Sequence, residues 1–132
     1  MTCDANGTPL AAVLTAGQCH ESKSVGSLVD GVKIGRRRRP GHGVGDKGYS
    51  YPFVRRLLRA RRIVPVIPTR SDQEPDPAFD ADAYRGRNVI ERLVGWLKER
   101  RRLCTRFEKL AASYLAMVKL AFIERCLQMA HG

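Results

Sequence analysis

The order of apolar and polar positions along this chain predicts short strands that alternate with amphipathic helices. Apolar residues 1–3 and 10–14 flank the sequence Asp4-Ala5-Asn6-Gly7-Thr8, whose Asn-Gly pair is typical of a tight turn. The chain is therefore expected to begin with a β-hairpin. In residues 24–32 the apolar side chains recur at helical spacing, which predicts a short helix.

The middle of the chain predicts a basic loop, a helix and a strand. Residues 36–43 hold four consecutive arginines followed by Pro-Gly-His-Gly, which indicates a basic and flexible loop. Residues 51–62 predict a helix, because Pro52 suits its first turn and arginines surround an apolar stripe. The β-branched run 63–67 predicts a short strand, and Pro65 favours an edge or end position for it.

Two helices are expected to close the chain. Residues 69–78 contain Pro75 and Pro77, which indicates a loop. Residues 82–102 then predict one continuous helix, and residues 107–128 predict a second helix rich in Ala and Leu. The resulting order of strands and helices indicates the α/β class, and 132 residues suffice for one domain with one modest core.

The charge balance indicates a polyanionic partner. The chain has 24 Lys and Arg against 13 Asp and Glu, a formal net charge of +11 that no fold requires. A basic surface kept only for solubility is the alternative. Because the arginines occur in clusters, nucleic acid is the favoured partner.

Cysteine spacing and hydropathy narrow the class of protein. The four cysteines are widely spaced and form no CxxC pair, which favours free thiols in a reducing cytosol over disulfides or a zinc site. The N-terminus lacks the pattern of a signal peptide, and charges interrupt the most apolar stretch, residues 110–127. A soluble cytoplasmic protein with no membrane partner is expected.

Asp46 is the first candidate for chemistry. It stands in Gly45-Asp46-Lys47-Gly48-Tyr49 directly before a predicted helix, where small neighbours would let a metal or a phosphate approach closely. A turn or helix-capping aspartate is the alternative, and the residues alone favour it. The stretch 43–48 also matches GxGxxG, but arginines precede it instead of the apolar strand that a dinucleotide site needs.

Glu91 is the second candidate, because it shares helical spacing with three other functional side chains. Tyr84, Arg87, Glu91 and Lys98 are separated by three, four and seven residues, so they would lie along one stripe of the helix 82–102. The stripe is either a surface salt-bridge ladder or a metal-binding carboxylate between phosphate-binding groups. Spacing alone does not decide between the two.

These motifs resemble those of bacterial DDE transposases of the IS4/IS5 type. Asp46-Lys47-Gly48-Tyr49 is similar to the second-aspartate motif of that family, and Tyr84-x2-Arg87-x3-Glu91-x6-Lys98 reproduces its Tyr-Arg-Glu-Lys signature at every spacing. Residues 4–10 and 14–18 resemble its second and third strands. The resemblance implies an RNase H-like fold, a mixed sheet flanked by helices, and DNA transposition that uses Mg²⁺ or, as a substitute, Mn²⁺.

The resemblance also implies roles for individual residues. Asp46 and Glu91 would be the second and third catalytic carboxylates and would bind the metal. The DNA-binding residues would be Tyr84, Arg87 and Lys98, together with Arg37, Arg39, Arg56 and Arg101 as contributors to phosphate attraction.

The first catalytic aspartate of the family lies on a strand upstream of the predicted hairpin, and Asp4 is not that residue because it occupies the turn. Residues 1–132 would thus be the C-terminal part of the catalytic domain, a partial RNase H-like fold that lacks the first strand and is inactive alone. It would act on transposon ends together with an upstream reading-frame product or a full-length transposase, in a nucleoid-associated location. The alternatives are a DNA-binding fragment that inhibits the full-length enzyme and a non-functional remnant.

Overall fold

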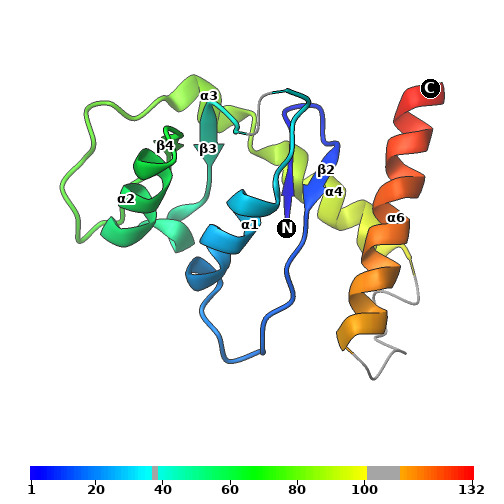
Figure 1. Ribbon diagram of the computed structural model, residues 1–132. Coiled ribbons are helices and arrows are strands. Elements are labelled where there is room, and N and C mark those ends of the chain that lie inside the picture. Colours follow the sequence, from blue (N-terminus) through cyan, green and yellow to red (C-terminus); the bar gives the residue numbers. More distant parts are fainter. Residues whose placement is uncertain (37–38, 101–110) are drawn as a thin grey trace. The chain divides into compact units, whose positions relative to one another are not determined.

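The computed structural model describes residues 1–36, 39–100 and 111–132 (Figure 1). The chain divides into two compact units. Unit 1 comprises Met1–Leu14 and Asn88–Gly132, and unit 2 comprises Thr15–Arg87. Each unit contains both helices and strands, so the predicted mixed α/β class is confirmed.

Unit 1 begins with the hairpin that the Asn-Gly pair predicted. Strands β1 (Thr2–Cys3) and β2 (Pro9–Ala11) pair in the antiparallel sense. Asp4 builds the turn, because its Oδ1 accepts hydrogen bonds from the backbone N–H groups of Asn6 at 2.9 Å and Thr8 at 2.8 Å. Asp4 therefore has a structural role in the turn, in agreement with its position in the sequence.

The rest of unit 1 is helical. Helix α4 (Asn88–Lys98) is followed by α6 (Ala111–His131), which agrees with the helix predicted over 107–128 where the structure describes it; residues 101–110 lie outside the described part. Three buried side chains of α6 form the core of this unit against Trp96 and Leu97, namely Val118, Ala121 and Phe122. No helix formed by the described residues combines the length and the apolarity that a membrane crossing requires.

The prediction of one continuous helix over residues 82–102 is wrong. Helix α3 (Ala81–Arg85) ends at Gly86, its C-cap residue, and α4 begins only at Asn88. The N–H groups of Gly86 and Arg87 donate to carbonyls three residues earlier, which closes a turn instead of continuing an α-helix. Glycine loses more backbone freedom in a helix than any other residue, so the break falls where a helix is weakest. It coincides with the boundary between the two units.

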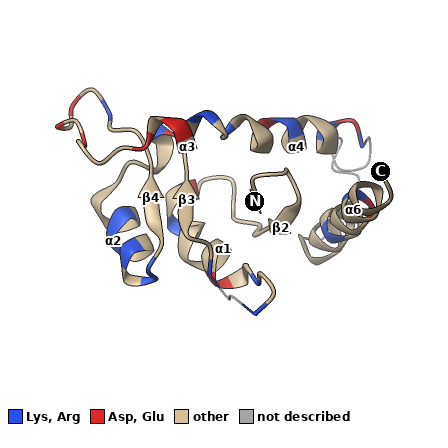
Figure 2. Cartoon of the chain, turned by 90° about the horizontal axis from the view of Figure 1, so that it is seen from above, with Lys and Arg blue, Asp and Glu red and all other residues tan. Residues whose placement is uncertain are grey.

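Two predicted helices form in unit 2. Helix α1 (Val25–Gly31) lies within the predicted range 24–32, and α2 (Pro52–Ala60) lies within 51–62. Tyr51 is the N-cap residue of α2, and proline stands in its first turn as expected. The polar face of α2 is basic (Figure 2). Its apolar face joins the core of unit 2, formed by Val25, Val54, Leu58, Ile63 and Ile67.

The strands of unit 2 form a parallel pair, β3 (His42–Val44) with β4 (Val64–Val66). Because His42 and Gly43 belong to β3, the flexible loop predicted over residues 36–43 is wrong in its last two positions. A strand that reads His-Gly-Val has no apolar alternation, so the sequence carries no signal for it. Tertiary packing decides instead: a Cβ on Gly43 would meet the Ile63 side chain at 3.3 Å, so the strand lies tightly on the core.

The described strands form two separate two-stranded sheets, one antiparallel and one parallel. The resemblance implies a single mixed sheet. The mixture of helices and strands establishes the α/β class. The partial RNase H-like fold and the single domain over residues 1–132 remain predictions.

Candidate metal and nucleic-acid site

Asp46 lies at the corner where β3 leads into the helical part of unit 2. It is the N-cap residue of a short 3-10 helix, η2 (Lys47–Tyr49), and its Oδ1 accepts a hydrogen bond of 2.8 Å from the Gly48 N–H. The structure thus shows the capping role that the residues alone favoured. A carboxylate has about four acceptor positions on two oxygens, so this single bond leaves the exposed Asp46 able to bind a cation as well.

Aromatic and cationic side chains hold the loop after Asp46 in place. The Arg70 guanidinium lies 4.4 Å from the centroid of the Tyr51 ring, and its Nε donates to the Lys47 carbonyl oxygen at 3.2 Å. The His20 ring packs edge-on against Tyr51 with centroids 5.6 Å apart. His20 and Arg70 were not predicted as site residues, because they lie some 30 and 20 residues from this loop and no motif links them to it.

Tyr49 connects this loop to a second acidic residue. Its hydroxyl donates to Glu21 Oε2 at 3.2 Å. Burial of the ring, the Glu21 carboxylate and, to a smaller extent, Asp46 raise the pKa of Tyr49 to about 12. Glu21 and Asp46 thus both raise the pKa of the Tyr49 phenol. Glu21, which was not predicted as a site residue, therefore lies near the motif.

Tyr49 is expected to make the fold sensitive to alkali. Below pH 10 the phenol is protonated in the folded and the unfolded chain alike, so its stabilising contribution is fully present. Between pH 10 and about 12 only the unfolded chain releases the proton, and the free energy of unfolding falls as the pH rises. The full difference corresponds to ~2.7 kcal/mol, and solvent screening of this partly exposed group reduces the expected loss to about 1 kcal/mol.

Urea unfolding at pH 9 and pH 11.5 measures this effect. Tyr49→Phe should be less stable at pH 9 and lose less stability at the higher pH, whereas the control Tyr51→Phe should keep the alkaline loss. Equal pH dependence in Tyr49→Phe and the original chain would contradict the assignment.

The Tyr-Arg-Glu-Lys signature is distributed over several elements, so the prediction of one stripe on one helix is wrong. Tyr84 lies in α3 and Arg87 in the turn that follows, with the Arg87 guanidinium 5.7 Å from the Tyr84 ring centroid. Glu91 lies in the first turn of α4, and Lys98 is the last residue of that helix. A separation of seven residues places Glu91 and Lys98 on one face of α4, two turns apart.

The remaining predicted DNA-binding residues are arginines. Arg39 and Arg56 are exposed, and Arg56 belongs to the basic face of α2. Arg37 and Arg101 lie outside the described residues.

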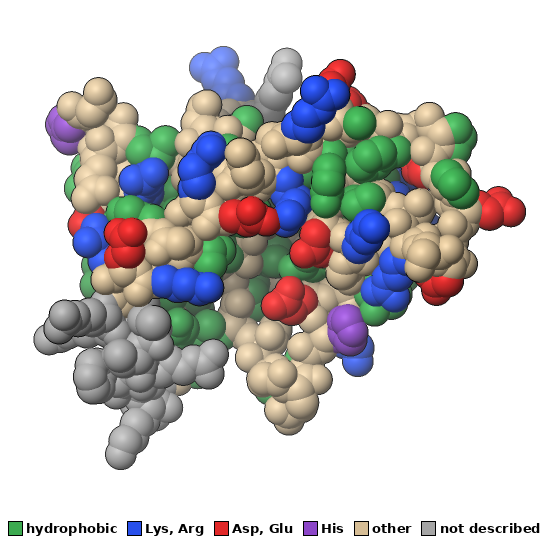
Figure 3. Space-filling model, turned by 180° about the vertical axis from the view of Figure 1, so that it is seen from behind, with side chains coloured by type: hydrophobic (Ala, Val, Ile, Leu, Met, Phe, Trp, Pro, Cys, Tyr) green, Lys and Arg blue, Asp and Glu red, His purple; other side chains and the backbone are tan. Residues whose placement is uncertain are grey.

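On the face of the molecule drawn in Figure 3, acidic side chains lie among the basic ones.

The donor types at Asp46 and Glu91 fit a hard divalent cation, which prefers carboxylate oxygens. The two residues belong to different units. Within residues 1–36, 39–100 and 111–132, no three His, Cys, Asp or Glu side chains lie close enough together to hold a metal ion. Cys3, Cys19 and Cys126 are free thiols.

A net charge of +11 is typical of proteins that bind nucleic acids. Comparison with known families defines the class further. Residues 1–123 match the family described as Transposase DDE domain, and the chain belongs to that family.

Two curated proteins are similar to this chain. A protein of Burkholderia cepacia described as a candidate transposase for insertion sequence element IS402 is 37% identical over 123 residues, which are 89% of this chain and 56% of that protein. A protein of Brucella ovis described in the same way for element IS6501 is 32% identical over 122 residues, 89% of this chain and 88% of that protein. This chain thus spans little more than half of the first relative. No solved structure matches it significantly.

Proposed function

We propose that this chain is the C-terminal part of the catalytic domain of an insertion-sequence transposase of the IS4/IS5 type. In the complete enzyme it takes part in the cleavage and rejoining of DNA strands at transposon ends. The match of residues 1–123 to the Transposase DDE domain family is the observation that carries the proposal. A metal-dependent strand-cleavage assay tests it.

Asp46 and Glu91 are proposed as two of the three carboxylates that hold the metal, Mg²⁺ or Mn²⁺. When bound, such ions activate the attacking oxygen and stabilise the departing oxygen of a phosphoryl displacement. Asp46 is suited to this role because it is exposed and lies between glycines, which leave room for a phosphate. The chain alone is expected to be inactive, because two carboxylates hold these cations poorly.

The proposed fold is a partial RNase H-like domain over residues 1–132 that a strand from an upstream segment completes. Support comes from the two small described sheets, because each strand pairs on one side only within its sheet. The other side of each strand could pair with a further strand. The upstream segment would also contribute the first catalytic aspartate. It would be supplied by the upstream reading frame or by a full-length transposase.

DNA contacts are proposed for residues of both units. Tyr84, Arg87 and Lys98 would bind the backbone near the transposon end, and the arginines would add attraction that does not depend on sequence. The Tyr84 ring beside the Arg87 guanidinium supports a joint role for that pair, because the ring restricts where the cation can lie.

A second function is a DNA-binding fragment that inhibits the full-length enzyme. The observation that favours it is the net charge of +11 together with the basic face of α2, since neither depends on a complete metal site. The steepness with which salt weakens DNA binding tests this function. A remnant without function is the third alternative.

Gly48→Ala is expected to reduce strand cleavage by the completed enzyme by about 10- to 100-fold, the cost of misplacing a catalytic group by an ångström or so. A Cβ on Gly48 would lie 2.9 Å from Asp46 Oδ1, so the carboxylate must move. Stability should fall by only about 1 kcal/mol, the cost of weakening the capping hydrogen bond that Asp46 Oδ1 accepts from the Gly48 N–H. The control is Gly41→Ala, where no atom lies within 4 Å of the added Cβ. Full activity in Gly48→Ala would contradict a metal-binding role for Asp46.

A further inference from the structure

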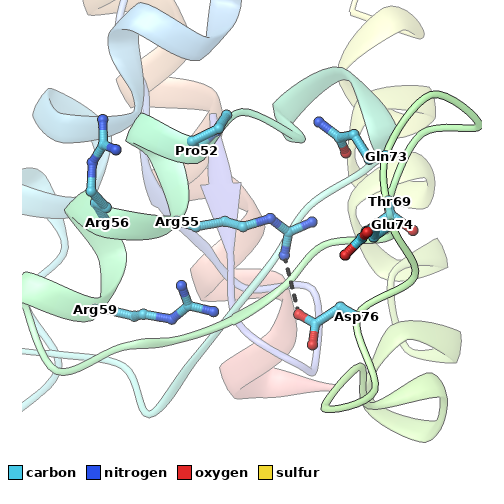
Figure 4. Close-up of a pocket in the computed structure, with 8 residues that line it drawn as sticks. All are labelled: Pro52, Arg55, Arg56, Arg59, Thr69, Gln73, Glu74 and Asp76. Atoms are coloured by element: carbon cyan, nitrogen blue, oxygen red, sulfur yellow. Dashed lines mark ion pairs between the residues drawn. The ribbon is translucent and has the colours of Figure 1, made fainter.

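A pocket of about 380 Å³ lies in unit 2 between α2 and the loop that follows β4 (Figure 4). Its volume is in the range of pockets that bind small molecules. Three arginines of α2 line it, and residues of the loop contribute a hydroxyl and two carboxylates. The polar lining residues that matter here are Arg55, Arg56, Arg59, Thr69, Glu74 and Asp76. Neither Asp46 nor Glu91 is among the lining residues.

Arg55 is held rigidly at this pocket. Its Nη2 donates to the Ile67 carbonyl oxygen at 2.9 Å and to Ser50 Oγ at 3.2 Å. Ser50 is only 1% exposed and is fixed in turn by Gln73, whose Oε1 accepts from Ser50 Oγ at 2.6 Å and whose Nε2 donates to the Ser50 carbonyl oxygen at 2.9 Å. The position of the guanidinium is therefore set before any ligand arrives.

The other terminal nitrogen of Arg55 is buried without a hydrogen-bond partner. Its nearest acidic atom is Asp76 Oδ2 at 3.7 Å, which is an ion pair but too long for a hydrogen bond. A buried donor left unsatisfied is costly, so an acceptor that binds there would stabilise the arginine. In Figure 4 the guanidinium of Arg59 points toward the same space between Arg55 and Asp76.

We propose that this pocket binds a phosphate group, from a DNA backbone or as the free anion. Arginine presents several N–H donors in a planar fork that suits phosphate oxygens, and Arg55 and Arg59, about one turn apart on α2, both line the pocket. The Thr69 hydroxyl supplies a further donor. The three arginines outnumber the two carboxylates, so the lining favours an anion over a cation. A phosphate oxygen would take the place beside Arg55 that Asp76 approaches without reaching hydrogen-bond distance.

Titration of the ¹⁵N-labelled 132-residue chain with sodium phosphate at constant ionic strength tests this site. The expected result is a saturable shift of the Arg55 side-chain and Thr69 backbone N–H signals. Arg59→Gln should weaken phosphate binding about 10-fold, and Asp76→Asn should strengthen it by removing the competing carboxylate. Asn retains the oxygen that accepts from the Ala78 N–H, so the loop should keep its structure.

The matched control is Arg62→Gln, an exposed arginine just beyond α2 that does not line the pocket. It should leave phosphate affinity unchanged. Absence of saturable shifts, or equal losses in Arg59→Gln and Arg62→Gln, would overturn the proposal.

A second titration with a short duplex DNA distinguishes the two sources of phosphate. A larger loss of DNA affinity in Arg59→Gln than in Arg62→Gln assigns the pocket to the DNA backbone. A loss confined to inorganic phosphate assigns it to the free anion, and both results support the site. The measurement involves neither metal nor strand cleavage, so its failure is distinct from failure of the proposed transposase function.

Discussion

Mg²⁺-dependent cleavage of transposon-end DNA is expected from the chain joined to its upstream reading frame, and not from the 132-residue chain alone. In the proposed function the joined protein would hold three carboxylates for the metal, whereas the chain alone would offer only Asp46 and Glu91. Asp46→Ala or Glu91→Ala in the joined protein should each reduce cleavage by about 10³-fold or more, the scale on which loss of an essential catalytic group acts. A gel assay of strand cleavage with Mg²⁺ or Mn²⁺ measures these rates.

Two exposed acidic residues outside the proposed site provide matched controls for this assay. Asp72→Ala and Glu99→Ala remove the same charge from units 2 and 1, respectively, and should leave cleavage unchanged. Cleavage by the pure 132-residue chain would contradict its expected inactivity. Failure of both proteins to cleave would reject the catalytic proposal and leave DNA binding or a remnant.

The affinity of the lone chain for duplex DNA is expected to fall roughly 10²-fold between 50 and 200 mM salt, if about four phosphates are neutralised on binding. The physical reason is that each Lys or Arg that pairs with a phosphate releases a condensed counterion, and added salt opposes that release. Fluorescence anisotropy over a salt series measures the slope. A slope near zero would contradict the DNA-binding function.

One arginine of α2 can be tested within the same series. Arg56→Gln should reduce the magnitude of the salt slope by about one, because one phosphate contact is lost. Arg85→Gln is the control: Arg85 lies 2.7 Å from Asp82 Oδ1, so its charge is already balanced in the folded chain. If the chain shows no cooperative thermal melt by circular dichroism, the remnant alternative is favoured instead.

Local sequence patterns predicted most of the secondary structure, because those patterns arise from interactions between near neighbours. The Asn-Gly hairpin formed around Asp4, and the apolar stripe after Pro52 formed α2. The motif around Asp46 lies directly before helical structure, as predicted. The patterns failed at β3, where His42 and Gly43 carry no alternation, and at Gly86, where a helical pattern ran through a break.

By itself the sequence determined the α/β class, the basic character and the two motifs that place the chain among DDE transposases. Only the tertiary structure decided which distant residues meet, such as Glu21 with Tyr49 and the buried Ser50 with Gln73 and Arg55. These contacts join residues that lie 5 to 28 positions apart. Packing and the need to satisfy buried polar groups determine which residues make these contacts. Neither factor produces a periodic pattern in the sequence.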